Sequence, residues 1–134
     1  MSVERAFFDT NVLIYAATSG EPREGIADAL MSRGGFVSVQ VLNEFVAVSR
    51  HKRRASWPEI LQALYAFRGL LQNPLPITMD LHLHALQISQ EHGYHIYDSL
   101  IIASAVEAGC TVLYSEDLQD GKVIEGLTIR NPFR

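Results

Sequence analysis

The chain has 134 residues, of which 48% are hydrophobic and 19% charged, and its formal net charge is −4 at pH 7. This length and mixture predict one globular domain, residues 1–134, with a core of useful size. The negative charge excludes a protein that coats nucleic acid by bulk positive charge, but not an enzyme that approaches phosphates through metal ions.

Residues that interrupt helices and strands, chiefly Gly and Pro, recur at short intervals and divide the chain into short strands and helices. Strands are expected where β-favouring apolar residues precede a turn, and helices where apolar residues recur at three- and four-residue spacing. In chain order, we expect a strand over 5–8, helices over 12–17 and 23–33, a strand over 36–39, helices over 41–50 and 56–71, a strand over 76–79, helices over 80–92 and 98–108, a strand over 111–114, and a strand pair within 122–129. Ser56 and Asp80 are the expected N-caps of their helices.

The alternation predicts an α/β fold with a parallel sheet and helices on both faces. In such sheets the ligand site lies outside the carboxyl ends of the strands. Asp9 and Asp117 each follow a strand directly, so a site is expected around them.

The single cysteine and the apolar segments indicate the cellular compartment in which the protein is expected. Cys110 has no partner for an internal disulfide, which is typical of a reducing environment, and its apolar neighbours predict a buried thiol. No apolar segment has the length of a membrane span, and the N-terminal stretch lacks the pattern of a signal peptide. We therefore expect a cytoplasmic protein.

Four carboxylates interrupt or flank apolar runs, and they are Asp9, Glu44, Asp98 and Asp117. Isolated carboxylates are expensive to bury, so several that converge need a positive partner. A divalent metal ion with oxygen ligands is the most economical partner. Hard cations held in this way activate water and stabilise both oxygens of an in-line phosphodiester cleavage.

Each carboxylate also has a structural interpretation. Glu44 shares a helix face with Val41 and Val48, so it forms either a buried ion pair with an arginine or the edge of the apolar stripe. Asp98 is well placed to cap a helix and complement its dipole. In this view Asp9 and Asp117 are ordinary turn residues after strands. Only the convergence of all four favours a metal site.

The acids lie in four short segments: Phe8-Asp9-Thr10-Asn11-Val12-Leu13, Asn43-Glu44, Tyr97-Asp98-Ser99-Leu100-Ile101-Ile102-Ala103 and Tyr114-Ser115-Glu116-Asp117-Leu118. In order and spacing they resemble the PIN-domain ribonucleases, in particular the VapC-type toxins of prokaryotic toxin–antitoxin pairs. The resemblance runs from Phe7 to about Gly121. It implies a three-layer α/β/α fold, Mg²⁺- or Mn²⁺-dependent cleavage of RNA, and a small antitoxin that reaches into the site with a basic side chain.

The resemblance also implies residue roles. The catalytic and metal-binding carboxylates would be Asp9, Glu44, Asp98 and Asp117. Asn11 would orient these ligands, and Thr10 and Ser115 would offer hydroxyls at the same rim. Asp120 lies in the same loop as the fourth acid and would replace or assist it.

Three other features have open interpretations. The basic run Arg50–Arg54 either holds RNA backbone near the site or complements the dipole at a helix end. The helix-spaced apolar residues from Leu61 to Leu71 are expected in the core or at a homodimer interface. Four histidines match no zinc spacing and are expected on the surface or in the core, namely His82, His84, His92 and His95.

Two other functions compete with a nuclease. Phosphoaspartate-forming hydrolases and receiver domains also place an aspartate after the first strand. A haloacid-dehalogenase-like enzyme, however, needs a second aspartate where Asn11 stands, and both classes need a lysine that neither Lys52 nor Lys122 supplies. A PIN fold kept as a binding module would lack one or more of the four acids, and all four are present. The sequence therefore favours an endoribonuclease.

Overall fold

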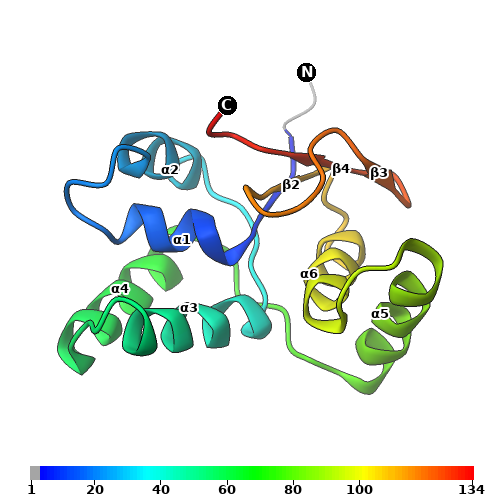
Figure 1. Ribbon diagram of the computed structural model, residues 1–134, viewed down its shortest axis with the longest axis horizontal. Helices are drawn as coiled ribbons and strands as arrows, with labels where there is room; N and C mark the ends of the chain where they lie inside the picture. The colour runs from blue at the N-terminus through cyan, green and yellow to red at the C-terminus, as the bar shows by residue number, and fades with distance from the viewer. Residues whose placement is uncertain (1–3) are drawn as a thin grey trace.

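A computed structural model describes residues 4–134, in which six helices accompany a small four-stranded sheet (Figure 1). The elements in chain order are β1 (Ala6–Phe8), α1 (Thr10–Ala16), α2 (Glu24–Met31), α3 (Val39–His51), α4 (Trp57–Leu70), α5 (Met79–His92), α6 (Ile96–Glu107), β2 (Val112–Tyr114), β3 (Val123–Ile124) and β4 (Leu127–Arg130). The domain expected over residues 1–134 is thus described from residue 4 onward, and residues 1–3 lie outside the described part.

The sheet has the strand order β1-β2-β4-β3. Phe7 of β1 lies opposite Leu113 of β2, which lies opposite Ile129 of β4, and both pairings are parallel. Only the short β3 runs antiparallel to its neighbour β4. These three central residues are fully buried, as expected for parallel strands covered on both faces. The expected mainly parallel α/β fold is confirmed.

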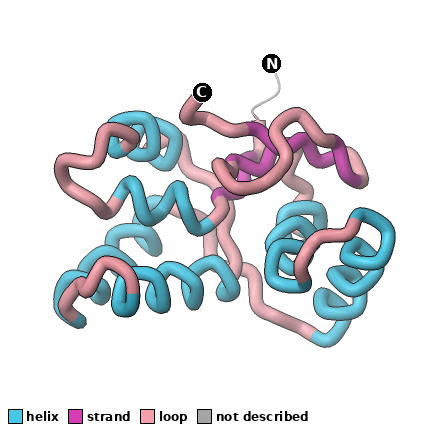
Figure 2. The backbone as a smooth tube through the Cα atoms, in the orientation of Figure 1, coloured by secondary structure: helices cyan, strands magenta, loops and turns pink. Residues whose placement is uncertain are grey.

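The helices form two groups on either side of the strands. In Figure 1, α1 to α4 lie on the left and α5 and α6 on the right. Figure 2 shows the same division, with the strands in magenta running from the centre of the view across the top of the right-hand group. Helices α5 and α6 pack against each other, and α1 packs against α2 and α3. The ends of β1 and β2 therefore open between α1, α3 and α6.

The prediction of strands over 36–39 and 76–79 is wrong. The segment 36–39 forms only two isolated bridges, Phe7 with Phe36 and Ser38 with Leu75, and residues 76–78 carry neither strand nor bridge. The extended segment after α2 is cut short because the Ser38 hydroxyl accepts a hydrogen bond from the Val41 amide at 3.3 Å and so caps α3. Local β-propensity predicted the extended backbone but not the early start of the helix.

Hydroxyl caps also decide where α4 and α5 begin. Ser56 caps α4 as expected, in a capping box with Glu59. Thr78, rather than the expected Asp80, caps α5, because its hydroxyl accepts a hydrogen bond from the Leu81 amide at 3.1 Å. Asp80 lies in the first turn, where its charge complements the helix dipole.

The expected burial of the single cysteine is confirmed. Cys110 is buried and free, and burial raises the pKa of its thiol to about 11. No helix within residues 4–134 combines the length and the apolar character needed to cross a bilayer.

Candidate active site

All four carboxylates singled out from the sequence line one open cavity of about 310 Å³. Asp9 directly follows β1, and Asp117 lies in the loop after β2. Glu44 projects from α3, and Asp98 lies in the first turn of α6. The fold therefore brings together side chains from four separate elements at the carboxyl end of the parallel strands, where a ligand site is expected.

Asp9 is the most deeply placed of the four. It is the N-cap of α1 and is only 5% exposed. Its Oδ1 accepts a hydrogen bond from the Thr10 amide and its Oδ2 accepts one from the Ser115 hydroxyl, both at 2.7 Å. Burial raises the pKa of Asp9 to about 7; these two hydrogen bonds oppose the shift, and the charges of Glu44 and Asp98 add to it.

Glu44 is half-buried and held by neutral partners. The Gln40 side-chain amide donates to its Oε2 at 2.8 Å, and the Thr10 hydroxyl lies 3.5 Å from its Oε1. Within residues 4–134 Glu44 forms no ion pair, so the interpretation as a buried pair with arginine is wrong. Burial raises the pKa of Glu44; the hydrogen bond from Gln40 opposes that shift, and the charge of Asp98 adds to it.

Asp98 is not the cap of its helix. His95 is the N-cap of α6, and its Nδ1 accepts a hydrogen bond from the Tyr97 amide at 3.2 Å. Asp98 lies in the first turn, half-buried, with its carboxylate in the cavity. Burial raises its pKa, the charge of His95 opposes that shift, and the charge of Asp117 adds to it.

Ser115 and Asn11 organise the loop that carries Asp117. The fully buried Ser115 hydroxyl accepts hydrogen bonds from the amides of Asp117 and Leu118, at 3.2 and 3.3 Å. The Asn11 side chain donates to Asp117 Oδ2 at 3.3 Å and accepts from the Glu116 amide at 3.2 Å. Asn11 and Ser115 thus fix both the carboxylate and the backbone of this loop.

Asp120 lies away from the cavity. Its Oδ1 accepts a hydrogen bond from the Asn131 amide at 2.9 Å, and its Oδ2 lies 3.8 Å from Arg134. Asp117 lines the cavity, and Asp120 does not. Of the two acids that the sequence left open, only Asp117 stands with the other three.

The cavity also contains side chains that the sequence did not single out. Glu116 and Tyr15 line it, and the Tyr15 hydroxyl donates a hydrogen bond to Glu116 Oε2. Arg23 pairs with Glu116 Oε1 at 2.7 Å and lies 4.2 Å from the Tyr15 ring centre. Burial and this contact with Glu116 raise the pKa of Tyr15 to about 12. No local pattern marks Arg23, because its role depends on where α2 packs.

The donors at the cavity suit a hard divalent cation. They are carboxylate, amide and hydroxyl oxygens, without sulfur, and burial raises the pKa values of Asp9, Glu44 and Asp98. Within residues 4–134 no three His, Cys, Asp or Glu side chains already form a complete ligand set. Magnesium keeps several waters and needs only one or two direct carboxylates, so this open arrangement fits it.

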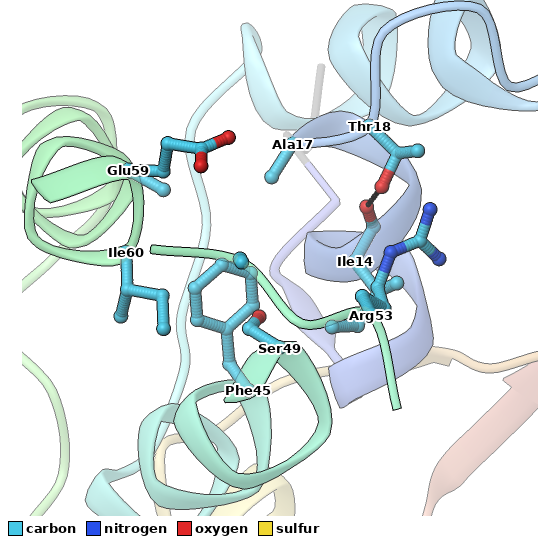
Figure 3. Close-up of a pocket in the computed structure, with 10 residues that line it drawn as sticks. Ile14, Ala17, Thr18, Phe45, Ser49, Arg53, Glu59 and Ile60 are labelled. Carbon is cyan, nitrogen blue, oxygen red and sulfur yellow. Dashed lines mark hydrogen bonds between the residues drawn. The ribbon is translucent and has the colours of Figure 1, made fainter. Parts of the chain in front are cut away.

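A second, smaller cavity of about 60 Å³ lies between α1, α3 and α4 (Figure 3). Its walls include Ile14, Phe45 and Ile60, and the Thr18 hydroxyl on its rim donates to the Ile14 carbonyl at 2.6 Å. Glu59 is its one acidic side chain, and that carboxylate already serves the α4 capping box. The four carboxylates singled out from the sequence therefore line the larger cavity and not this one.

The histidines among the described residues do not form a metal site. His84 lies between two carboxylates, 3.0 Å from Glu125 and 3.7 Å from Glu107. These contacts join α5 to the end of α6 and to the β3–β4 turn, which is a structural role.

The chain is similar to known proteins over most of its length. The PIN domain family model matches residues 6–120. A structure of Mycobacterium tuberculosis VapC20, described as a Sarcin-Ricin loop cleaving toxin, is 24% identical with a TM-score of 0.67, over 84% of this chain and 89% of that one. No curated protein sequence matches the chain.

Two similar structures contain assemblies. A toxin–antitoxin complex from Klebsiella pneumoniae is 23% identical with a TM-score of 0.71, over 96% of this chain and 98% of that one. VapBC2 from Rickettsia felis, bound to a DNA fragment from its promoter, is 19% identical with a TM-score of 0.67, over 94% and 97%. At these identities the likeness concerns the fold.

Proposed function

The chain belongs to the PIN domain family, and on that premise we propose that it is a divalent-metal-dependent endoribonuclease. Mg²⁺ or Mn²⁺ would be held by the catalytic carboxylates Asp9, Glu44, Asp98 and Asp117. The observation that carries the proposal is their common position around one open cavity, with raised pKa values at three of them. Perturbed titratable groups that converge in a cleft are typical of catalytic sites.

The bound cation would supply Lewis-acid chemistry, which activates water and offsets charge on the phosphate oxygens. The chain's own residues hold the ligands in place. Ser115 and the Thr10 amide fix both oxygens of Asp9, and Asn11 fixes Asp117. Such contacts to ligand carboxylates orient them and tune their basicity.

Glu44 is set differently. The Gln40 amide holds one of its oxygens and the Thr10 hydroxyl lies near the other. Because these partners are neutral, the full charge of Glu44 remains available to a cation. The carboxylate therefore has to lose its proton before it binds, which ties metal affinity to pH.

We also propose that the chain is the toxin of a toxin–antitoxin module, with a small antitoxin protein as partner. Support comes from the similar structures, which include a toxin–antitoxin complex and a toxin described as cleaving the Sarcin-Ricin loop. A cavity lined by several carboxylates would accept a basic side chain from such a partner. Co-purification of the chain with a small protein from its native host, and a growth defect when it is expressed alone, are the expected results.

Self-association remains a prediction. Leu61 and Tyr65 on α4 are 62% and 82% exposed, whereas Phe67 and Leu71 of the same apolar stretch are buried. The stretch thus contributes one face to the core and presents another, and the outer face would meet a second copy. Sedimentation of the native chain and of Tyr65→Glu tests this, with a dimer expected only for the former.

The nuclease itself is tested by RNA cleavage with added Mg²⁺. Native protein should cleave, EDTA should stop the reaction, and Asp9→Asn or Asp98→Asn should abolish it while circular dichroism shows an unchanged fold. Equal cleavage by all three proteins would identify a contaminant and refute the assignment. A binding module, the alternative, would bind RNA equally well with and without the metal ion and never cleave it.

A further inference from the structure

Two cations of the basic run share the cavity with the acids. Lys52 and Arg53 line it, whereas Arg50 and Arg54 do not. Arg50 instead donates to the Ala55 carbonyl at 3.0 Å and lies 4.8 Å from the ring centre of Trp57. The structure therefore divides a run that is uniform in sequence into residues that face the site and residues that support the chain.

Helix geometry explains why Lys52 faces the acids. Glu44 and Val48 of α3 and Lys52, the C-cap residue of that helix, are spaced four residues apart and line the same cavity. Eight residues of helix span about 12 Å, so the acidic and basic ends of this stripe are well separated. The chain turns at the end of α3, where the amides of Lys52 and Arg53 both donate to the Val48 carbonyl. Arg53 then lies beside Ile14 of α1 (Figure 3).

These cations are not neutralised by the acids. Among the ion pairs of residues 4–134, none includes Lys52 or Arg53, while Glu116 is already paired with Arg23. The hydrogen bond from Arg23 lowers the pKa of Glu21, and the charge of Arg53 adds to this shift. Glu21 is already paired with Arg23, however, so the folded chain gives neither Lys52 nor Arg53 an ion-pair partner among the described residues.

We infer that Lys52 and Arg53 bind a backbone phosphate of the RNA that neighbours the scissile phosphate on the same strand. The inference rests on the proposed function and adds the residues that position the substrate. A strand whose scissile phosphate lies at the carboxylates extends along the cavity toward the end of α3, where its next phosphates meet these two cations. Such contacts fix register without reading sequence.

The test measures RNA binding without cleavage. The Asp98→Asn protein is titrated into fluorescein-labelled single-stranded RNA with Mg²⁺ present, and anisotropy is recorded at several salt concentrations. Lys52→Gln and Arg53→Gln are each added to this background. Arg54→Gln is the matched control, because it removes the same charge at the neighbouring position, which does not line the cavity.

We expect Lys52→Gln and Arg53→Gln each to weaken binding about three- to tenfold and to lower the salt slope by about 0.7. Arg54→Gln should change both by much less. In the cleavage-competent protein the two site variants should raise KM more than they lower kcat, and melting curves should show that all variants fold.

Two outcomes overturn the inference. Equal weakening by all three substitutions would show a bulk charge effect, and no weakening by any would show that these residues do not touch RNA. Either result, obtained while native protein still cleaves, leaves the proposed nuclease intact. Absence of cleavage by the native protein would instead refute the nuclease, and the phosphate contact with it.

Discussion

The hydroxyl of Ser115 donates a hydrogen bond to Oδ2 of Asp9 at 2.7 Å. The bond joins the loop after β2 to the residue after β1, and β1 and β2 are adjacent parallel strands. Because Ser115 also accepts hydrogen bonds from the backbone amides of Asp117 and Leu118, one buried hydroxyl links the Asp9 carboxylate to the loop that carries Asp117. The spacing of Asp9 and Asp117 therefore follows from the pairing of the two strands and from this single side chain.

Ser115→Ala should damage both stability and activity. It leaves a buried oxygen of Asp9 without its donor, which costs about 1–3 kcal/mol of unfolding free energy. Loss of an orienting contact to a ligand should reduce cleavage about 10- to 100-fold. Ser104→Ala is the control, because Ser104 is equally buried and its hydroxyl donates only to the Leu100 carbonyl of its own helix. Urea unfolding and cleavage rates measure the two effects, and equal rates for both variants would contradict the prediction.

The variants Asp117→Asn and Asp120→Asn should show which of the two acids in this loop contributes to metal binding. Only Asp117 lines the cavity, and Asn11 orients its carboxylate. We expect Asp117→Asn to raise the Mg²⁺ concentration needed for half-maximal cleavage about tenfold or more. Asp120→Asn should leave that concentration unchanged, since Asp120 contacts the C-terminal segment. A Mg²⁺ requirement raised more by Asp120→Asn would reverse the assignment.

Stability in EDTA should fall as the pH rises from about 4 to about 7. The pKa of Asp9 is about 7 in the folded chain and near 3.9 when unfolded, so the folded state binds this proton more tightly. Its contribution is complete below about pH 4 and is lost as the pH passes through about 7, a change of at most about 4 kcal/mol. The burial of Glu44 and Asp98 shifts their pKa values in the same direction.

Chemical unfolding of native protein and Asp9→Asn across this pH range provides the measurement. The variant should show a flatter profile, because asparagine does not titrate. Mg²⁺ should stabilise the native protein more at high pH than at low pH, since the cation binds the deprotonated carboxylates. Parallel profiles for the two proteins would show that Asp9 ionises normally.

Arg23→Ala should loosen the loop that carries Asp117. Arg23 pairs with both Glu21 and Glu116 and stacks on Tyr15. Because solvent screens the charge of this partly exposed arginine, the loss of unfolding free energy should be small. Cleavage should fall more for Arg23→Ala than for Arg23→Lys, which keeps the charge. Arg33→Ala, which removes an exposed arginine with no ion pair among residues 4–134, is the control. An equal effect of Arg33→Ala would show that Arg23 has no specific role in holding this loop.

Much of the fold was predictable because local signals and packing agree. The helices from α2 to α6 lie near their expected ranges, and Ser56 caps α4 as its sequence indicates. The errors occur where a side chain overrides local propensity. Ser38 and Thr78 end extended segments by capping helices, so the segment 36–39 forms only isolated bridges and the segment 76–79 forms no strand. Single residues of this kind decide boundaries that averaged propensities cannot place.

The sequence by itself determined which acids are candidates for a site and what chemistry they suggest. Asp9, Glu44, Asp98 and Asp117 stand beside apolar runs where an uncompensated charge is costly, and this is visible without coordinates. Their family order also pointed to the PIN domain, which the match over residues 6–120 confirms.

Only the tertiary structure decided which neighbours act with these acids. It placed Asp117 in the cavity and Asp120 outside it, and it brought Lys52 and Arg53 to the cavity while leaving Arg54 away from it. Ser115 reaches Asp9 only because β1 and β2 pair in parallel. Such contacts join residues far apart in the chain, and their distances depend on how strands and helices pack, which local periodicity does not encode.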